Sequence, residues 1–319
     1  DESMLLSYFG RVNYNYEGKY LLNATFRADG SSRFAKNNRW GYFPSISAGW
    51  VMSNESFMSE SQNWLDFLKL RASWGQVGNQ NIDAWQYLAP IQTSNVNYYF
   101  KSDDFDASGN TPGAYPSRLA NEDLKWETSE QLNLGFDVRF IKGKLGLNFD
   151  WYKKTTKDWL LEAPILATAG ADAPYINGGN VENNGVEINL NWNDNLGGFK
   201  YFVNGNVSYN KNKVTEVPTS DGIVHGLTNM LYDNSVEFYH RAETGYPIGY
   251  FYGYKTDGIF QNEAEVLSYT NAGKVVQPSA KPGDLRYVDI NKDGTINEAD
   301  KTMIGDPNPD FTFGFSTGF

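Results

Sequence analysis

The sequence lacks cysteine entirely and has only two histidines among its 319 residues. Without cysteine there are no disulfides, no thiolate nucleophiles and no zinc sites built on sulfur. His225 and His240 lie apart in the chain without an H-E-x-x-H spacing, so the sequence offers few residues for a histidine-based metal site or catalytic triad. We therefore expect no enzymatic activity and name no catalytic residue.

Long apolar runs and an excess of positive charge are also missing. No stretch approaches the ~18 consecutive apolar residues of a membrane-spanning helix, and the mean hydropathy is −0.55. Asp and Glu number 38 against 27 Lys and Arg, so the formal net charge is −11. Such an acidic chain repels phosphate backbones, and we expect no nucleic-acid partner. Aromatic residues make up 16%, which excludes disorder and favours β-structure.

Alternation of apolar and polar residues is the dominant pattern, and a period of two indicates β-strands. In residues 131–140 the apolar positions are Leu132, Leu134, Phe136, Val138 and Phe140. The same period recurs at residues 8–16, 20–28, 46–52, 68–74, 145–152, 186–192, 201–209 and 311–319. These segments predict about nine antiparallel strands, mostly near the ~9 to 11 residues that cross a bilayer at a tilt.

The connections between the predicted strands alternate in length. Residues 17–19, 142–143 and 195–198 are short turns, residues 53–64 are intermediate, and residues 30–41, 76–128 and 155–183 are long loops. Short turns at one rim and long loops at the other are typical of an outer-membrane barrel. The same alternation requires residues 214–309 to be one long-rim excursion. We therefore assign residues 1–213 to barrel strands with extracellular loops, 214–309 to the excursion and 310–319 to the next strand.

The pattern leaves one other fold open. A secreted β-sandwich that is stabilised by calcium and binds glycans would also alternate apolar and polar residues, with its apolar face as the core. Large aromatic residues near the strand ends, together with the strand length, favour the barrel. In a barrel Leu134, Phe136, Leu147 and Phe149 face lipid, whereas in a sandwich they face a second sheet.

Several stretches resemble a known family. They are FRADGSSRFAKNNRWGYFPSISAGW at residues 26–50, LKLRASWGQVGNQNI at 68–82, KWETSEQLNLGFD at 125–137, GYPIGYFYGYKTDGIFQ at 245–261, and GDLRYVDINKDG and IGDPNPDFTFGFSTGF within 282–319. In these stretches the chain resembles the SusC/RagA group of TonB-dependent outer-membrane transporters from Bacteroidetes.

The resemblance implies a transmembrane antiparallel β-barrel of about 22 strands in the bacterial outer membrane, in contact with its lipid. It also implies an N-terminal plug, energy supplied by TonB through that plug, a SusD-like surface lipoprotein as a lid, and import of an oligosaccharide or peptide. We find no plug and no TonB box in the sequence. We therefore expect a central-to-late barrel segment with unpaired strand edges at both ends.

One local motif carries chemistry of its own. Residues 289–300 read D-x-N-x-D-G-x-I-x-x-x-D, the ligand spacing of an EF-hand-type loop. The predicted Ca²⁺ ligands are Asp289, Asn291, Asp293, Thr295 through its carbonyl, Asn297 and Asp300. Asp300 stands where Glu is usual, and its shorter side chain would weaken the site. The other interpretation is an Asx-rich turn without a cation. A bound ion would stiffen the excursion ahead of the last strand.

The long loop of residues 76–128 is rich in aromatic side chains. Trp85, Tyr98, Tyr99 and Phe100 are the predicted contacts with a sugar cargo or with the lipoprotein lid, because exposed aromatic patches often mark binding surfaces. The other interpretation is that these rings, with Tyr87, pack against the loop itself.

Overall fold

The computed structural model describes residues 3–93, 97–99, 110–163, 165, 167–225 and 240–319. The chain forms two compact units. The first, here called the wall unit, comprises Asp1–Thr219 and Asp310–Phe319, and the second, here called the excursion unit, comprises Ser220–Pro309. No described helix has both the length and the apolar character needed to cross a membrane.

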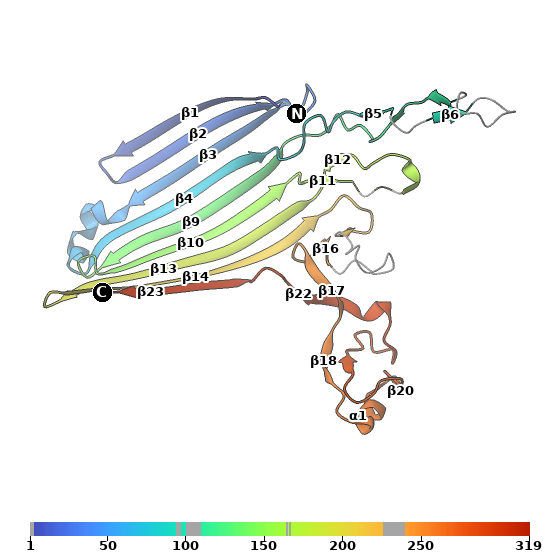
Figure 1. The fold of residues 1–319 in the computed structure, drawn as a ribbon. Coiled ribbons are helices and arrows are strands. Elements are labelled where there is room, and N and C mark those ends of the chain that lie inside the picture. The colour runs from blue at the N-terminus through green and yellow to red at the C-terminus, as the bar shows by residue number, and fades with distance from the viewer. Residues whose placement is uncertain (1–2, 94–96, 100–109, 164, 166, 226–239) are drawn as a thin grey trace. The chain divides into compact units, whose positions relative to one another are not determined.

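The wall unit is built on one antiparallel sheet of nine strands (Figure 1). In spatial order these are β1 (Leu5–Tyr16), β2 (Tyr20–Ser31), β3 (Trp40–Val51), β4 (Leu65–Asn79), β9 (Glu127–Phe140), β10 (Leu145–Lys157), β13 (Asn180–Leu196), β14 (Phe199–Glu216) and β23 (Phe311–Gly318). Spatial order follows chain order throughout, and β1 and β23 form the two edges. The prediction of nine antiparallel strands of a barrel wall is confirmed.

The connections sort by length onto the two rims of this sheet. Short turns join β1 to β2, β9 to β10 and β13 to β14, and the 3-10 helices η1 (Met52–Asn54) and η2 (Ser56–Asn63) join β3 to β4. Gly18 and Gly198 adopt positive φ in two of the turns, and each donates its N–H to the side chain of an asparagine three residues earlier. We call this the short rim and the opposite one the long rim.

The long rim carries residues 32–39, 80–126, 158–179 and 217–310. Within its loops, small two-stranded sheets are formed by β5 (Ile91–Gln92) with β8 (Tyr115–Pro116), β6 (Asn97–Tyr99) with β7 (Asn110–Pro112), and β11 (Leu160–Glu162) with β12 (Tyr175–Asn177). The short helix η4 (Ala167–Ala169) lies between β11 and β12. Three of these four connections therefore contain described helices or strands of their own.

The hydrophobic core of the wall unit lies at the long rim and not against the apolar face of the sheet. Its buried members are Phe34, Phe43, Ile82, Leu124 and Trp126, with Leu160 and Tyr175 packed against them. The rings of Phe34 and Phe43 each lie 5.4 Å from that of Trp126, whose indole N–H donates to the carbonyl of Arg39 at 2.8 Å. This core holds several long-rim loops together above the strands.

The excursion unit is assembled from short elements. A four-stranded sheet contains β15 (Ile223–His225), β16 (His240–Glu243), β17 (Tyr250–Tyr254) and β22 (Lys301–Gly305); two hairpins pair β18 (Thr256–Ile259) with β21 (Leu285–Tyr287) and β19 (Thr270–Asn271) with β20 (Lys274–Val275). The helices are α1 (Glu263–Ser268), capped by Asn262, and η5 (Glu298–Asp300). Because β14 pairs directly with β23, β17 lies outside the nine-stranded sheet.

Candidate functional site

One face of the nine-stranded sheet is apolar from edge to edge. A single register row crosses all nine strands through Tyr16, Tyr20, Trp50, Leu70, Phe136, Phe149, Ile188, Val207 and Phe313. Leu134 and Leu190, in other rows of this face, are 44% and 45% exposed. The β-sandwich interpretation is therefore wrong, because in the described part of the chain no second sheet covers these residues. Side chains of this kind suit contact with hydrocarbon.

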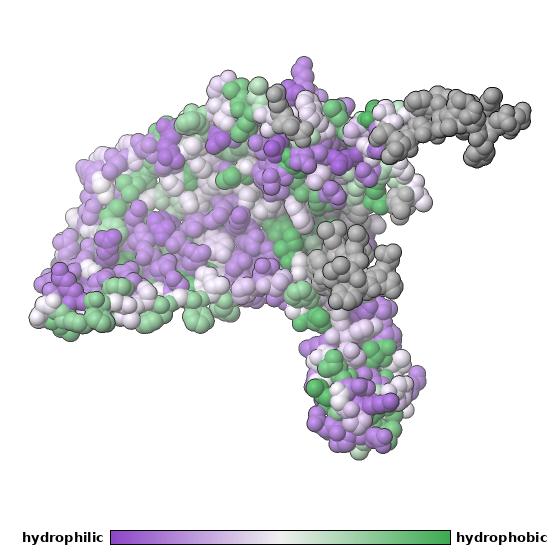
Figure 2. Space-filling model, in the orientation of Figure 1, coloured by the Kyte–Doolittle hydropathy of each residue, from purple (hydrophilic) through white to green (hydrophobic). Residues whose placement is uncertain are grey.

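The opposite face is polar. The adjacent register row crosses the same strands through Asn15, Leu21, Gly49, Arg71, Gly135, Asp150, Glu187, Ser208 and Thr312. A further row aligns Asn148, Asn189 and Asn206. Figure 2 shows hydrophilic residues gathered over the side of the sheet that is turned toward the viewer. A wall with one apolar and one polar face is what a barrel with a wet lumen requires.

The polar face is hollowed over strands β1 to β4 and β9. One hollow has a volume of about 430 Å³, and its lining includes Asn13, Asn23, Lys69, Arg71 and Asn133. Amide groups, hydroxyl groups and two cations therefore surround it, while the net charge of the whole chain is negative. This surface can donate and accept hydrogen bonds with a polar solute or with another polar protein surface.

Arg71 links three strands on the polar face. Its guanidinium on β4 donates two hydrogen bonds of 2.9 Å to the carboxylate of Asp137 on β9. It donates two more, of 2.9 and 3.0 Å, to the carboxylate of Asp150 on β10. The amide of Asn148 also donates to Asp137. One cation thus serves two carboxylates in a bidentate manner, which fixes the geometry of this part of the wall.

A cluster at the short rim joins the end of β3 to the β1–β2 hairpin. The carboxylate of Glu55 accepts hydrogen bonds from the Tyr20 hydroxyl at 2.7 Å and from the Trp50 indole N–H at 3.1 Å, and the Lys19 ammonium lies 3.3 Å away. The hydrogen bond from Tyr20, followed by that from Trp50, lowers the pKa of Glu55 below its usual value. The rings of Tyr20 and Trp50 are stacked, as in an interfacial aromatic belt.

The predicted cation loop of residues 289–300 folds around two buried carboxylates. Asp289 is 4% exposed and accepts the N–H of Asp293 at 3.2 Å and of Gly294 at 2.8 Å. Asp300 is fully buried and accepts the N–H of Ile290 and of Asn297, each at 2.8 Å. The first and last residues of the motif are therefore both buried, and each carboxylate binds backbone N–H groups of the loop.

The side chains between these carboxylates surround Asp293. The amides of Asn291 and Asn297 donate to its carboxylate at 2.9 and 3.1 Å, and these bonds, led by that from Asn291, lower the pKa of Asp293. Asn297 also caps η5 in a capping box with Asp300. Among the described residues no group of three or more acidic, His or Cys side chains could hold a metal by itself. A cation here would depend on amide and carbonyl oxygens as well.

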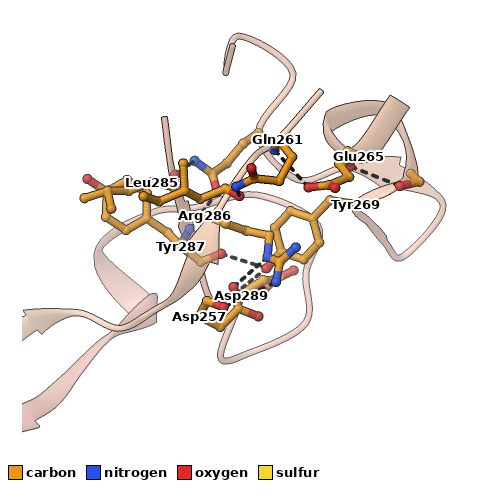
Figure 3. Close-up of polar contacts among 11 residues, drawn as sticks. Asp257, Gln261, Glu265, Tyr269, Leu285, Arg286, Tyr287 and Asp289 are labelled. Atoms are coloured by element: carbon orange, nitrogen blue, oxygen red, sulfur yellow. Dashed lines mark hydrogen bonds and ion pairs between the residues drawn. The ribbon is translucent and has the colours of Figure 1, made fainter. Parts of the chain in front are cut away.

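Residues outside the motif support the loop. The Asn271 amide donates to the Asp289 carboxylate at 3.0 Å. The Tyr269 hydroxyl accepts the Asp289 N–H at 3.2 Å and donates to the carbonyl of Tyr287 at 2.7 Å (Figure 3). Gly294 has φ +84°, and a Cβ there would lie 2.6 Å from the carbonyl oxygen of Asn271. Glycine at position 6 therefore allows the loop to approach the β19–β20 hairpin.

The predicted aromatic contacts of the long loop are only partly described. Trp85 is 51% exposed with φ +68°, and its ring lies 6.2 Å from that of Tyr87, which is 9% exposed. Tyr98 and Tyr99 belong to β6, and Phe100 lies outside the described residues. Trp85 thus presents an aromatic surface, and contact with a cargo or a lid stays a prediction for all four residues.

Sequence reasoning missed the Arg71 network and the Glu55 cluster. Glu55 lies between η1 and η2, where alternation gives no signal, whereas the Arg71 network could have been found from the strand pattern. Arg71, Asp137 and Asp150 each fall on the polar positions of an alternating segment. Isolated charges of opposite sign on one face of adjacent strands indicate cross-strand pairs.

Comparison with known proteins agrees with this two-faced wall. A family model described as TonB dependent receptor-like, beta-barrel matches residues 3–273. TonB-dependent receptor P3 of Formosa agariphila is 35% identical over 322 residues, which are 99% of this chain and 30% of that protein. TonB-dependent receptor SusC of Bacteroides thetaiotaomicron is 32% identical over 319 residues, covering 98% of this chain and 29% of SusC.

Solved structures of the RagAB peptide transporter show the same fold. One superposes with a TM-score of 0.76 at 24% identity and covers 99% of this chain and 31% of its own. The RagAB peptide importer in the 'closed-closed' state gives a TM-score of 0.73 at 26% identity, covering 98% of this chain and 31% of its own. This chain spans about 30% of the length of its curated relatives. The chain therefore belongs to the TonB-dependent receptor-like β-barrel family of the outer membrane, a family of receptors and transporters and not of enzymes, in which it is similar to SusC and RagAB.

Proposed function

We propose that this chain forms part of the wall and the outer loops of a TonB-dependent importer that takes up an oligosaccharide or a peptide. The observation that carries the proposal is the sheet itself, nine consecutive strands with one apolar face, one polar face and long loops on one rim only. In this arrangement the polar face borders the path of the cargo, and energy from TonB reaches the barrel through a plug domain.

A SusD-like surface lipoprotein is the proposed partner at the long rim. The structures similar to this chain are named RagAB, and the alignment with TonB-dependent receptor SusC covers 98% of this chain and 29% of SusC. Exposed Trp85, together with the β6 residues Tyr98 and Tyr99 and with Phe100, is the proposed contact with the cargo or with this lid. Aromatic rings suit both roles, because they stack on sugars and also contribute large contact areas at protein interfaces.

Uptake by whole cells tests the importer proposal. Cells that lack the full-length gene are complemented with the wild-type gene and supplied with labelled oligosaccharides or with a labelled peptide mixture. We expect uptake of one of the two cargo classes to depend on the gene and to stop when an uncoupler collapses the proton-motive force. Uptake that is the same with and without the gene would overturn the proposal. Co-purification of a surface lipoprotein with the full-length protein checks the partner.

We also propose that the loop of residues 289–300 binds Ca²⁺ as a structural ion. The spacing of Asp289, Asn291, Asp293, the carbonyl of Thr295, Asn297 and Asp300 supports this role. So does the burial of Asp289 and Asp300, the first and last residues of the motif, within the loop.

Calorimetry on the full-length protein tests the cation. We expect Ca²⁺ binding in the wild-type protein and its loss in Asp293→Ala. The matched control is Glu298→Ala, because Glu298 lies in the same segment but its side chain is 75% exposed. An absence of heat and of any Ca²⁺-dependent change in melting temperature in the wild-type protein would leave the Asx-rich turn as the explanation.

A further inference from the structure

Strands β3 and β4 separate before they reach the long rim. Their pairing ends at Ser45 and Gly75, although both strands continue beyond these residues. Residues 40–44 of β3 stay paired with β2, and residues 76–79 of β4 stay paired with β9, but in the described part of the chain these two segments do not pair with each other. Pro44, which has no N–H to donate, lies where β3 leaves β4. The sheet is therefore open between β3 and β4 at its long-rim end.

The ring of Phe43 lies in this opening. A Cβ added to Gly41 of β3 or to Gly78 of β4 would clash with that ring, so the ring lies against the backbone of both strands. Phe43 is 7% exposed, and its ring meets that of Trp126 edge to face. Glycine at positions 41 and 78 thus admits an aromatic ring that holds the two strands apart.

A hollow of about 370 Å³ lies on the polar face at this opening. Its apolar lining includes Phe43 together with Leu5 and Val77, which are 48% and 68% exposed. Its polar lining includes the amide side chains of Asn79 and Gln80. Exposed apolar side chains are an exception on a face that is otherwise polar, and apolar surface beside a few polar groups is typical of ligand sites.

Hydrogen-bonding groups at the hollow are available to a ligand. Gln80 Oε1 is buried and has no hydrogen-bond partner among the described residues. Arg27 also lines the hollow, and its half-exposed guanidinium pairs with the buried carboxylate of Asp29 at 2.7 Å. The backbone groups that β3 and β4 turn toward each other beyond Ser45 and Gly75 have no ladder partner across the opening. Such unpaired strand edges are templates for a further strand.

The hollow continues along the polar face toward the short rim. It shares Thr25 and Val77 with a second hollow of about 400 Å³. The second hollow shares Asn23 and Asn133 with the hollow of about 430 Å³ that Arg71 lines. The three hollows form one groove, so a ligand bound at the opening lies at the long-rim end of that groove.

We propose that the opening between β3 and β4 binds a peptide in an extended conformation, with an apolar side chain in the hollow. The inference rests on the proposed importer function and selects a peptide in place of an oligosaccharide as the cargo. The unpaired strand edges favour a peptide, because an extended main chain carries N–H and C=O groups at the spacing of a strand. The lining by Leu5, Phe43 and Val77 favours an apolar side chain over a ring that carries hydroxyl groups.

Native mass spectrometry of the full-length protein in detergent tests the ligand class. The probes are a tryptic digest of casein and a mixture of malto-, xylo- and cello-hexaose at the same total concentration. We expect the wild-type protein to retain peptides with at least one apolar residue and not the hexaoses. A retained peptide is then synthesised again, once with serine at its apolar positions and once with methylated backbone amides. Each form should bind about tenfold more weakly or worse, since one loses the apolar contact and the other loses main-chain donors.

A double variant locates the site. Leu5→Asn combined with Val77→Asn should weaken retention of the peptide about tenfold, because only exposed apolar surface is removed from the hollow. The matched control is Leu196→Asn at the short-rim end of β13, where the leucine is 64% exposed, and it should bind like the wild-type protein.

The outcomes separate this inference from the importer proposal. Retention of a hexaose without any peptide would overturn the inference, while gene-dependent uptake of that sugar would leave the importer proposal standing. Retention of neither class would also overturn the inference. So would unchanged peptide retention in the double variant, and a lower melting temperature of that variant would then assign the opening to contact with another part of the protein.

Discussion

The guanidinium of Arg71 on β4 reaches across an entire strand to the carboxylate of Asp150 on β10, with bonds of 2.9 and 3.0 Å. The intervening strand β9 places Gly135 between them, and the register aligns all three residues. A Cβ at position 135 would lie 2.5 Å from Asp150 Oδ1 and 3.1 Å from the Arg71 guanidinium. Glycine therefore opens the path by which one cation ties three strands of the wall together.

Replacing that glycine should weaken the wall. In Gly135→Ala the new methyl group would also lie 2.6 Å from the carbonyl oxygen of Phe149, so backbone as well as side chain must move. We expect a loss of about 1–3 kcal/mol, seen as a lower melting temperature of the full-length protein in detergent. Gly205→Ala is the matched control, since nothing lies within 4 Å of a Cβ at that position of β14. Equal melting temperatures for the two variants would contradict this account.

The two carboxylates that share Arg71 should be energetically coupled to it. Arg71→Gln leaves Asp137 and Asp150 facing each other without their cation, whereas Asp150→Asn leaves the pair between Arg71 and Asp137 in place. We expect the arginine variant to be the less stable of the two. The double variant should lose less than the sum of both, with a coupling of about 0.5–3 kcal/mol in a double-mutant cycle. Additive losses would mean that the network contributes no interaction energy.

The strands were predictable from the sequence because period-two alternation is a local property. The partners across the strands were not. Register between β4 and β9 depends on how residues 80–126 fold, and alternation alone is compatible with any shift of two residues. The polar face also contains Val181 and Val214, which are 8% and 0% exposed. They depart from the wet-lumen pattern near the long rim, where the loops have a core of their own.

The cation loop, too, could be predicted from the sequence only in part. Ligand spacing in the sequence pointed to the residues of this loop, and the carboxylates of Asp289 and Asp300 are both buried and accept backbone N–H groups of the loop. The hydrogen bonds from Asn271 and Tyr269 to Asp289 could not be predicted from the sequence. Asn271 lies in β19 and Tyr269 directly before it, and neither residue belongs to the spacing of the motif. Glu55 was missed for the same reason, since its partners Tyr20 and Trp50 depend on how η1 and η2 turn at the short rim.

Glu55 should make the stability of the short rim depend on pH. Its pKa is lowered in the folded protein, mainly by the hydrogen bond from Tyr20. It therefore stabilises the fold above its unfolded pKa of about 4.3, and this contribution is lost as the pH falls through the lower folded value. We expect wild-type protein to melt at a higher temperature than Glu55→Gln at pH 7, with the difference narrowing below about pH 5.

Glu60 provides the control for this measurement. It lies in η2, five residues from Glu55, and is exposed. Glu60→Gln should leave the melting temperature unchanged at both pH values. A difference between wild-type and Glu55→Gln that stays constant across the acidic range would show that the carboxylate charge does not matter at this position.

The buried carboxylate of Asp300 should be essential to the excursion unit even without a cation. It accepts two backbone N–H groups at 2.8 Å, and an amide at this position offers only one acceptor oxygen. In Asp300→Asn we expect a loss of about 1–3 kcal/mol from the unsatisfied donor. Hydrogen exchange of residues 289–300, measured in EDTA on the full-length protein, should become faster. Glu298→Gln, at a side chain that is 75% exposed, should exchange like the wild-type protein.

The strongest test of the two faces uses adjacent residues of β9. Leu134 lies on the apolar face and is 44% exposed, and Asn133 lies next to it on the polar face. In Leu134→Arg the charge enters hydrocarbon, which costs about 2–4 kcal/mol at the bilayer midplane and less toward the interfaces, so we expect less folded protein in the outer membrane. In Asn133→Arg the charge enters a wet lumen and should change assembly little. Heat-modifiable mobility of the full-length protein from isolated outer membranes measures both. Equal losses, or a larger loss for Asn133→Arg, would mean that the apolar face does not contact lipid.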